Sequence, residues 1–155
     1  MATKLNQLDL KKYDLDGYEF EELISEKNIR KRVEEIGQEI SKDFANKIPV
    51  IIGVLNGSFL FMADLVRNIN IDYEVDFIKI SSYGNSTKSS GTVRLIKDIS
   101  ADINGRDLII VEDIVDTGLS VNFLNNRLKE AKPASINIRP LCSSIVIFFL
   151  LAISN

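Results

Sequence analysis

The sequence contains no histidine, no tryptophan and only one cysteine, Cys142, among its 155 residues. The absence of histidine excludes Ser–His–Asp and Cys–His catalytic machinery, and it also excludes histidine-ligated zinc. One cysteine allows neither an internal disulfide nor a cysteine cluster around a metal. Acid–base chemistry near neutral pH must therefore fall to carboxylates, lysines or tyrosines.

Excess positive charge is also absent. Lysine and arginine number 19 against 22 aspartates and glutamates, a formal net charge of −3, which gives no support for binding to nucleic acid or to an anionic membrane. The first residues, Met1–Leu8, lack the continuous apolar core of a secretory signal, so we expect a reduced, cytoplasmic setting. The length favours a single domain, residues 1–155, because no interdomain linker is visible.

Apolar periodicity predicts alternating helices and strands. Ile29, Val33, Ile36, Ile40 and Phe44 recur at helical spacing and indicate an amphipathic packing helix with Ser25 as its N-cap. In chain order, the patterns predict helices over 25–44, 59–68 and 120–131, strands over 50–55, 73–80, 93–95, 108–111 and 135–138, and a polar loop over 81–91. This alternation predicts an α/β fold with a mostly parallel sheet flanked by helices.

The last residues form an unusual tail. From Leu141 to Asn155 there is no charge, and residues 145–153 are uninterrupted apolar sequence. A membrane-spanning helix needs about 20 such residues, so this run is too short to cross a bilayer. Two explanations stay open, a buried terminal strand and a non-native end such as the product of a shifted reading frame.

The chemistry is concentrated in residues 109–120. An apolar strand is followed by two adjacent carboxylates, Glu112 and Asp113, and then by the segment Asp116–Ser120, which leads into a helix. In open α/β sheets, ligands bind beyond the carboxyl ends of the strands, and the start of a helix offers free N–H groups to a phosphate. Gly118 allows close approach to the backbone, while hydroxyl groups of Thr117 and Ser120 are available as donors.

Glu112 and Asp113 cannot bind phosphate directly, because like charges repel. Carboxylates accept hydrogen bonds from vicinal hydroxyls and bind Mg²⁺ through oxygen. The segment therefore suits a phosphorylated sugar, with Asp116 free to handle a proton. It is neither a Walker P-loop nor a G-x-G-x-x-G fingerprint. The alternative is that both acids are solvated residues at the end of a strand.

Residues 111–118, Val-Glu-Asp-Ile-Val-Asp-Thr-Gly, resemble the phosphoribosyl-pyrophosphate (PRPP) signature of the type I phosphoribosyltransferases, and more narrowly of hypoxanthine(-guanine) phosphoribosyltransferases. Residues 53–65 resemble the pyrophosphate-binding loop of that family and the helix after it. Residues 82–85 resemble its mobile catalytic loop. The resemblance covers about Leu23 to Ile138, with three motifs in the same order, and implies a type I phosphoribosyltransferase fold.

This resemblance implies the transfer of hypoxanthine or guanine to PRPP in purine salvage, which would yield a nucleoside monophosphate and pyrophosphate with Mg²⁺ as cofactor. It assigns the site residues as follows: Glu112 and Asp113 to the ribose hydroxyls and Mg²⁺; Asp116, Thr117, Gly118, Leu119 and Ser120 to the 5′-phosphate; Asp116 also to the proton at purine N7; Leu55, Asn56 and Gly57 to pyrophosphate; Ser82 and Tyr83 to a lid. It also implies that the Leu55–Asn56 peptide can be cis, and that the protein is a homodimer or homotetramer.

The sequence departs from the family at two places. Many relatives carry lysine where Asn56 stands, so that side-chain charge is missing here. The family's base-binding segment supplies a lysine, a stacking aromatic residue and a further aspartate, but residues 139–155 contain no lysine and no acid. Phe148 or Phe149 could stack on a base. No base-binding residue is assigned, and we expect impaired purine recognition and an exposed edge of the sheet.

Two alternatives to a purine-salvage enzyme remain on the sequence alone. One is a non-catalytic module that binds PRPP or a nucleotide, and the other is an inactive, truncated fragment. Retention of Asp116 favours catalysis, while the acidic charge balance disfavours a nucleic-acid partner.

Overall fold

The computed structural model describes residues 24–83, 92–114 and 118–142. Asp116, Thr117 and the apolar tail from residue 143 lie outside these ranges, as do residues 84–91 of the expected loop. The described elements are, in chain order, α1 (Glu26–Asp43), β1 (Val50–Leu55), α2 (Ser58–Val66), β2 (Glu74–Tyr83), β3 (Thr92–Lys97), β4 (Asp107–Ile114), α3 (Leu119–Lys129) and β5 (Ser135–Cys142).

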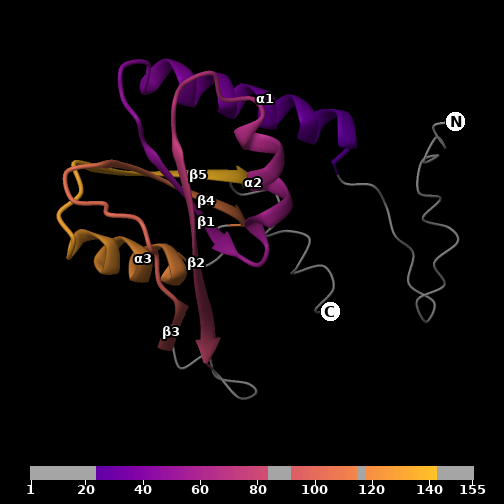
Figure 1. The fold of residues 1–155 in the computed structure, drawn as a ribbon. Coiled ribbons are helices and arrows are strands. Elements are labelled where there is room, and N and C mark those ends of the chain that lie inside the picture. The colour runs from indigo at the N-terminus through magenta and orange to yellow at the C-terminus, as the bar shows by residue number, and fades with distance from the viewer. Residues whose placement is uncertain (1–23, 84–91, 115–117, 143–155) are drawn as a thin grey trace, which may run out of the picture.

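The strands form one sheet in the order β3-β2-β1-β4-β5 (Figure 1). β1 runs parallel to both of its neighbours, β2 and β4, and β4 runs parallel to β5. Only β3 is antiparallel among the described strands, because it forms a hairpin with β2. The predicted α/β class with a mostly parallel sheet is therefore confirmed.

The helices cover both faces of the sheet, with α1 and α2 on one face and α3 on the other (Figure 1). Alternate residues of β1 show why its apolar run is continuous. Ile51 packs in a cluster with α1 and α2, whereas Ile52 packs in a second cluster with Leu124 and Leu128 of α3. A strand with helices on both faces needs apolar side chains at every position, so the predicted buried strand is confirmed.

Helix α1 begins as the sequence predicts. The Ser25 hydroxyl oxygen accepts a hydrogen bond from the Asn28 amide at 3.3 Å, which is the expected N-cap. Val33, Ile36 and Ile40 are buried against the sheet and α2. Ile29 differs from the expectation, since 38% of it is exposed in the first turn of the helix.

Four strands are longer than predicted, including β3, which covers Thr92–Lys97 where the sequence predicts 93–95. β2 includes Ser81–Tyr83, which the sequence places in a loop, because these polar residues pair with Thr92–Arg94 of β3. β4 continues through Glu112 and Asp113 to Ile114, and β5 continues to Cys142 because β4 provides a partner over this whole length. β5 forms one edge of the described sheet.

Candidate active site

Two chain segments far apart in sequence meet where β1 and β4 end. These strands are parallel neighbours, and Gly53 pairs with Val111 in the last matched position. Just beyond it, β1 gives way to the loop Leu55–Gly57, while β4 presents Glu112 and Asp113. The sheet order also reverses here, since the chain goes from β1 to β2 on one side and from β4 to β5 on the other. Such a reversal is the usual ligand position in α/β sheets.

The loop after β1 contains a cis peptide bond between Leu55 and Asn56, as the resemblance implies. Asn56 and Gly57 are exposed, whereas Ser58 is fully buried and donates a hydrogen bond to the Val54 carbonyl at 2.6 Å. This bond fastens the start of α2 to the end of β1. The backbone of the loop therefore has a fixed anchor and an open outer surface.

Asp113 lies directly against this loop. A Cβ atom built on Gly57 would lie 2.8 Å from the Asp113 carboxyl carbon and closer still to one of its oxygens. Only a residue without a side chain leaves this space for the carboxylate. The structure thus brings together the two segments to which the family resemblance assigns pyrophosphate and ribose.

Glu112 is half-buried, and its Oε2 atom is buried without a hydrogen-bond partner in the described parts of the chain. Burial, and secondarily the negative charge of Asp113, raises the pKa of Glu112 from 4.5 to about 7. A buried acceptor without a donor is costly, so Glu112 suits a ligand that brings hydroxyl donors or a cation.

Gly118 connects the site to α3. Its φ of 73° lies in the left-handed region, which glycine adopts without strain, and no atom of the residues that the structure describes lies within 4 Å of a Cβ placed there. The helix begins at Leu119, and Ser120 in its first turn is half-buried. These positions fit the expected phosphate loop, but Asp116 and Thr117 lie outside the described residues.

Lys79 also lies at this site, although the sequence alone does not indicate it. This residue of β2 pairs in register with Leu55, and its ammonium group donates a hydrogen bond to the Asn56 side-chain oxygen at 3.4 Å. Only the pairing of β1 with β2 brings the lysine to the loop, so no local sequence signal could have identified it.

Ser82 and Tyr83 lie on β2 rather than in a loop, and they pair with Val93 and Thr92 of β3. The predicted lid role of these two residues stays a prediction. So does the metal site at Glu112 and Asp113: within the described part of the chain, no group of three or more histidine, cysteine or acidic side chains is placed to hold a metal ion.

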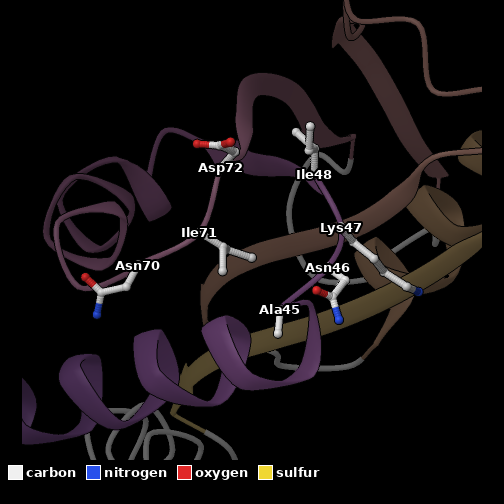
Figure 2. Close-up of a pocket in the computed structure, with 7 residues that line it drawn as sticks. All are labelled: Ala45, Asn46, Lys47, Ile48, Asn70, Ile71 and Asp72. Carbon is white, nitrogen blue, oxygen red and sulfur yellow. The ribbon is translucent and has the colours of Figure 1, made fainter.

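A hollow of about 500 Å³ lies at the other end of the sheet (Figure 2). It is formed by the segment before β1 and the segment before β2, at the amino ends of two parallel strands. Its lining residues are Ala45, Asn46, Lys47, Ile48, Asn70, Ile71 and Asp72. None of the predicted site residues that the structure describes lines this hollow, so it is separate from the described part of the candidate active site.

Fold and site together define an α/β protein with a ligand site at a reversal of strand order, made of an acidic pair, a glycine-containing loop and the start of a helix. The sequence matches the phosphoribosyl transferase domain family over residues 20–144, and the chain belongs to this family.

Named relatives agree with this assignment. The chain is 47% identical over 116 residues to a hypoxanthine-guanine phosphoribosyltransferase of Bacillus subtilis, covering 75% of this chain and 64% of the relative. A Bacillus anthracis hypoxanthine-guanine phosphoribosyltransferase structure superposes with a TM-score of 0.73 at 43% identity, covering 79% of this chain and 73% of that one. A Staphylococcus aureus hypoxanthine phosphoribosyltransferase structure gives a TM-score of 0.73 at 36% identity, covering 77% of this chain and 65% of that one.

The chain thus spans slightly less than two thirds of the length of the Bacillus subtilis relative. None of the helices in residues 24–83, 92–114 and 118–142 is both long enough and apolar enough to cross a membrane.

Proposed function

We propose that this chain is a purine-salvage transferase that joins hypoxanthine or guanine to PRPP, forming IMP or GMP and releasing pyrophosphate. The observation that carries the proposal is the contact of Asp113 with Gly57, which places an acidic pair beside a glycine loop at the switch point of the sheet. The names of the similar proteins support the same reaction.

In this proposal, the ligand lies across the carboxyl ends of β1 and β4. The loop Leu55–Gly57 binds pyrophosphate through its backbone, because its outer surface is open and its end is anchored by Ser58. The segment Asp116–Ser120 binds the 5′-phosphate, where the first N–H groups of α3 point out of the helix. The ribose ring then lies between these two sites.

Glu112 and Asp113 hold the ribose hydroxyls. The unpartnered Oε2 atom of Glu112 gains a hydroxyl donor when the sugar binds. Hydroxyl donors favour the ionised carboxylate and lower its pKa from the value near 7. The acidic pair also places negative potential beside the ring on which positive charge develops in the transition state.

Mg²⁺ fits this pair, because two adjacent carboxylates together with substrate oxygens form the kind of site that this ion prefers. Bound Mg²⁺ neutralises the pyrophosphate. We propose Glu112 and Asp113 as its protein ligands, either directly or through the ribose hydroxyls. The orphaned Oε2 atom of Glu112 supports this assignment.

Asp116 is the proposed proton acceptor at purine N7. It is a carboxylate in a chain without histidine, and it lies between the acidic pair and the phosphate loop in sequence. Ser82 and Tyr83 are proposed to close over the reacting centre and exclude water, which would protect PRPP from hydrolysis.

We propose that purine recognition is impaired, because residues 139–155 offer no lysine and no acid to the base. Isothermal titration with Mg-PRPP tests PRPP binding, and turnover assays with hypoxanthine then test purine recognition. Tight PRPP binding with slow but measurable turnover is expected. Normal turnover would refute the impaired recognition, and absence of PRPP binding would refute the proposed function.

A binding module without turnover is the second candidate, favoured by the same absence of lysine and acid from residues 139–155. Asp116→Asn separates the two candidates. In an enzyme, this change reduces turnover strongly and leaves PRPP affinity nearly unchanged. A binding module, or an inactive fragment, has no turnover to lose.

We further propose that residues 1–155 form one domain, act in the cytoplasm and assemble as a homodimer or homotetramer. Phe59 and Leu60, in the first turn of α2, are 55% and 75% exposed, and adjacent apolar side chains of this kind favour contact with a second copy. Light scattering coupled to gel filtration measures the assembly directly. A monomer at micromolar concentration would contradict it.

A further inference from the structure

Lys79 brings a cation to the loop after β1 from a neighbouring strand. Phe77 of β2 packs against the cluster under α1 and α2, whereas Ile78 packs in the cluster under α3. Because strand side chains alternate between faces, Lys79 lies on the α2 face, next to Leu55. From there its ammonium group reaches the Asn56 side-chain oxygen at 3.4 Å.

The charge of Lys79 is uncompensated in the described structure. Lys97 lies directly opposite on β3, but its ammonium group is occupied by the Asp76 carboxylate at 3.4 Å and the Phe77 carbonyl at 2.6 Å. Lys79 instead contacts the neutral carboxamide of Asn56, and in residues 24–83, 92–114 and 118–142 no carboxylate forms an ion pair with it. Lys97 is therefore held by an ion pair within the sheet, whereas the positive charge of Lys79 has no carboxylate partner in the described residues.

The loop itself carries no basic side chain, since Leu55, Asn56, Gly57 and Ser58 are all uncharged. Across the loop stands the carboxylate of Asp113, which repels an anion. A highly charged anion at this loop therefore needs a nearby cation, and Lys79 is placed to provide one.

We propose that Lys79 is a positioning residue for the pyrophosphate group of PRPP. Its ammonium group orients the Asn56 side chain and supplies positive potential at the loop. The inference rests on the proposed function, because it assumes that this loop receives pyrophosphate. Lys79 acts on the ligand through Asn56 and through its charge, without a part in the proton transfer.

The test measures binding of three ligands, Mg-PRPP, Mg-pyrophosphate and ribose 5-phosphate, by isothermal titration. Lys79→Gln is expected to weaken binding of the two pyrophosphate-containing ligands about three- to tenfold, a range typical of charged hydrogen bonds at an exposed site. Binding of ribose 5-phosphate stays unchanged, because that ligand has no group at the loop. The loss of affinity for the two pyrophosphate-containing ligands becomes smaller as salt concentration rises.

Three variants make the result specific. Lys79→Arg keeps the charge and is expected to restore most of the affinity. Asn56→Lys, added to Lys79→Gln, returns an ammonium group to the loop and is also expected to restore it. Lys129→Gln removes an exposed lysine from the last turn of α3, at the far end of that helix from the site, and serves as the matched control with unchanged binding.

The outcomes separate the two proposals. If the unchanged protein binds Mg-PRPP and Lys79→Gln binds it equally well, or loses ribose 5-phosphate affinity to the same extent, the role of Lys79 is wrong while the proposed function stands. If the unchanged protein does not bind Mg-PRPP, both are wrong. Equal thermal midpoints of Lys79→Gln and the unchanged protein verify that the fold is intact.

Discussion

The carboxylate of Asp113, on β4, lies against the backbone of Gly57 in the loop after β1. It occupies the space that a side chain at position 57 would fill. This contact couples the two halves of the sheet at the point where the ligand is proposed to bind. It also makes the geometry of the loop depend on a residue far away in sequence.

Gly57→Ala is expected to disturb this contact. The new methyl group would overlap the Asp113 carboxylate, so the loop or the acid must shift, with a cost of about 1–3 kcal/mol in the free energy of unfolding. Urea denaturation measures this loss, and titration with Mg-PRPP should show weaker binding.

A double-mutant cycle isolates the contact between these two residues. Adding Asp113→Ala to Gly57→Ala opens space for the methyl group and should recover most of the lost stability, while PRPP binding stays weak because the acid is gone. Additive losses of stability would show that the two residues do not interact.

The pH dependence of stability should report on Glu112 in the ligand-free protein. Its pKa is about 7 in the folded chain against 4.5 ordinarily, so the folded state holds more protons than the unfolded state between these values. Protonated Glu112 therefore stabilises the folded state fully below pH 4.5, and this stabilisation is lost as pH rises to about 7.

Glu112→Gln removes this titration. We expect the variant to gain about 1–2 kcal/mol relative to the unchanged protein at pH 8, after allowance for solvent screening of a partly exposed group, and little at pH 5. Urea denaturation at four pH values between 5 and 8 provides the comparison. Parallel curves for the two proteins would contradict the raised pKa.

Gly37→Ala should destabilise the packing of α1 on the end of α2. A Cβ atom at Gly37 would lie 2.6 Å from the Asn68 carbonyl oxygen, which is backbone and cannot rotate away. Overpacking of about 1–3 kcal/mol outweighs the roughly 1 kcal/mol that alanine gains in a helix. Gln38→Ala, at the exposed neighbouring position, is the control, and a more stable Gly37→Ala would contradict this packing.

Charge added to the apolar tail should raise the concentration at which the protein stays in solution. Residues 145–153 form an uncharged, β-prone run, a pattern that promotes aggregation when exposed. Phe149→Lys combined with Leu151→Lys interrupts it. Sedimentation after concentration measures the effect, and Lys129→Gln is the control. Equal solubility of the double variant and the unchanged protein would show that the apolar run does not drive association.

The buried strands and the helices could be predicted from the sequence because their causes are local. Val50–Leu55 is apolar throughout since both of its faces are covered, and Ser25 has the side chain that a helix start requires. Likewise, Glu112 and Asp113 could be proposed as candidate ligand residues because an acidic pair directly follows an apolar strand.

Features that depend on a distant partner could not be predicted. Ser81–Tyr83 is polar and becomes a strand only through pairing with β3. Phe59 matches the helical spacing of its neighbours but is 55% exposed, because the spacing alone does not show where the apolar cover ends. Lys79 joins the site only because β2 lies beside β1.

The order of strands in the sheet also bears on how the chain is synthesised. β2 follows β1 after a single short helix, but β4, the other neighbour of β1, is made only after the β2–β3 hairpin. Until Asp107–Ile114 leaves the ribosome, one backbone edge of the apolar strand Val50–Leu55 lacks its own partner and is open to other chains. A translational pause before Asp107–Ile114 has left the ribosome therefore favours aggregation of the nascent protein, while a pause after this segment has left does not.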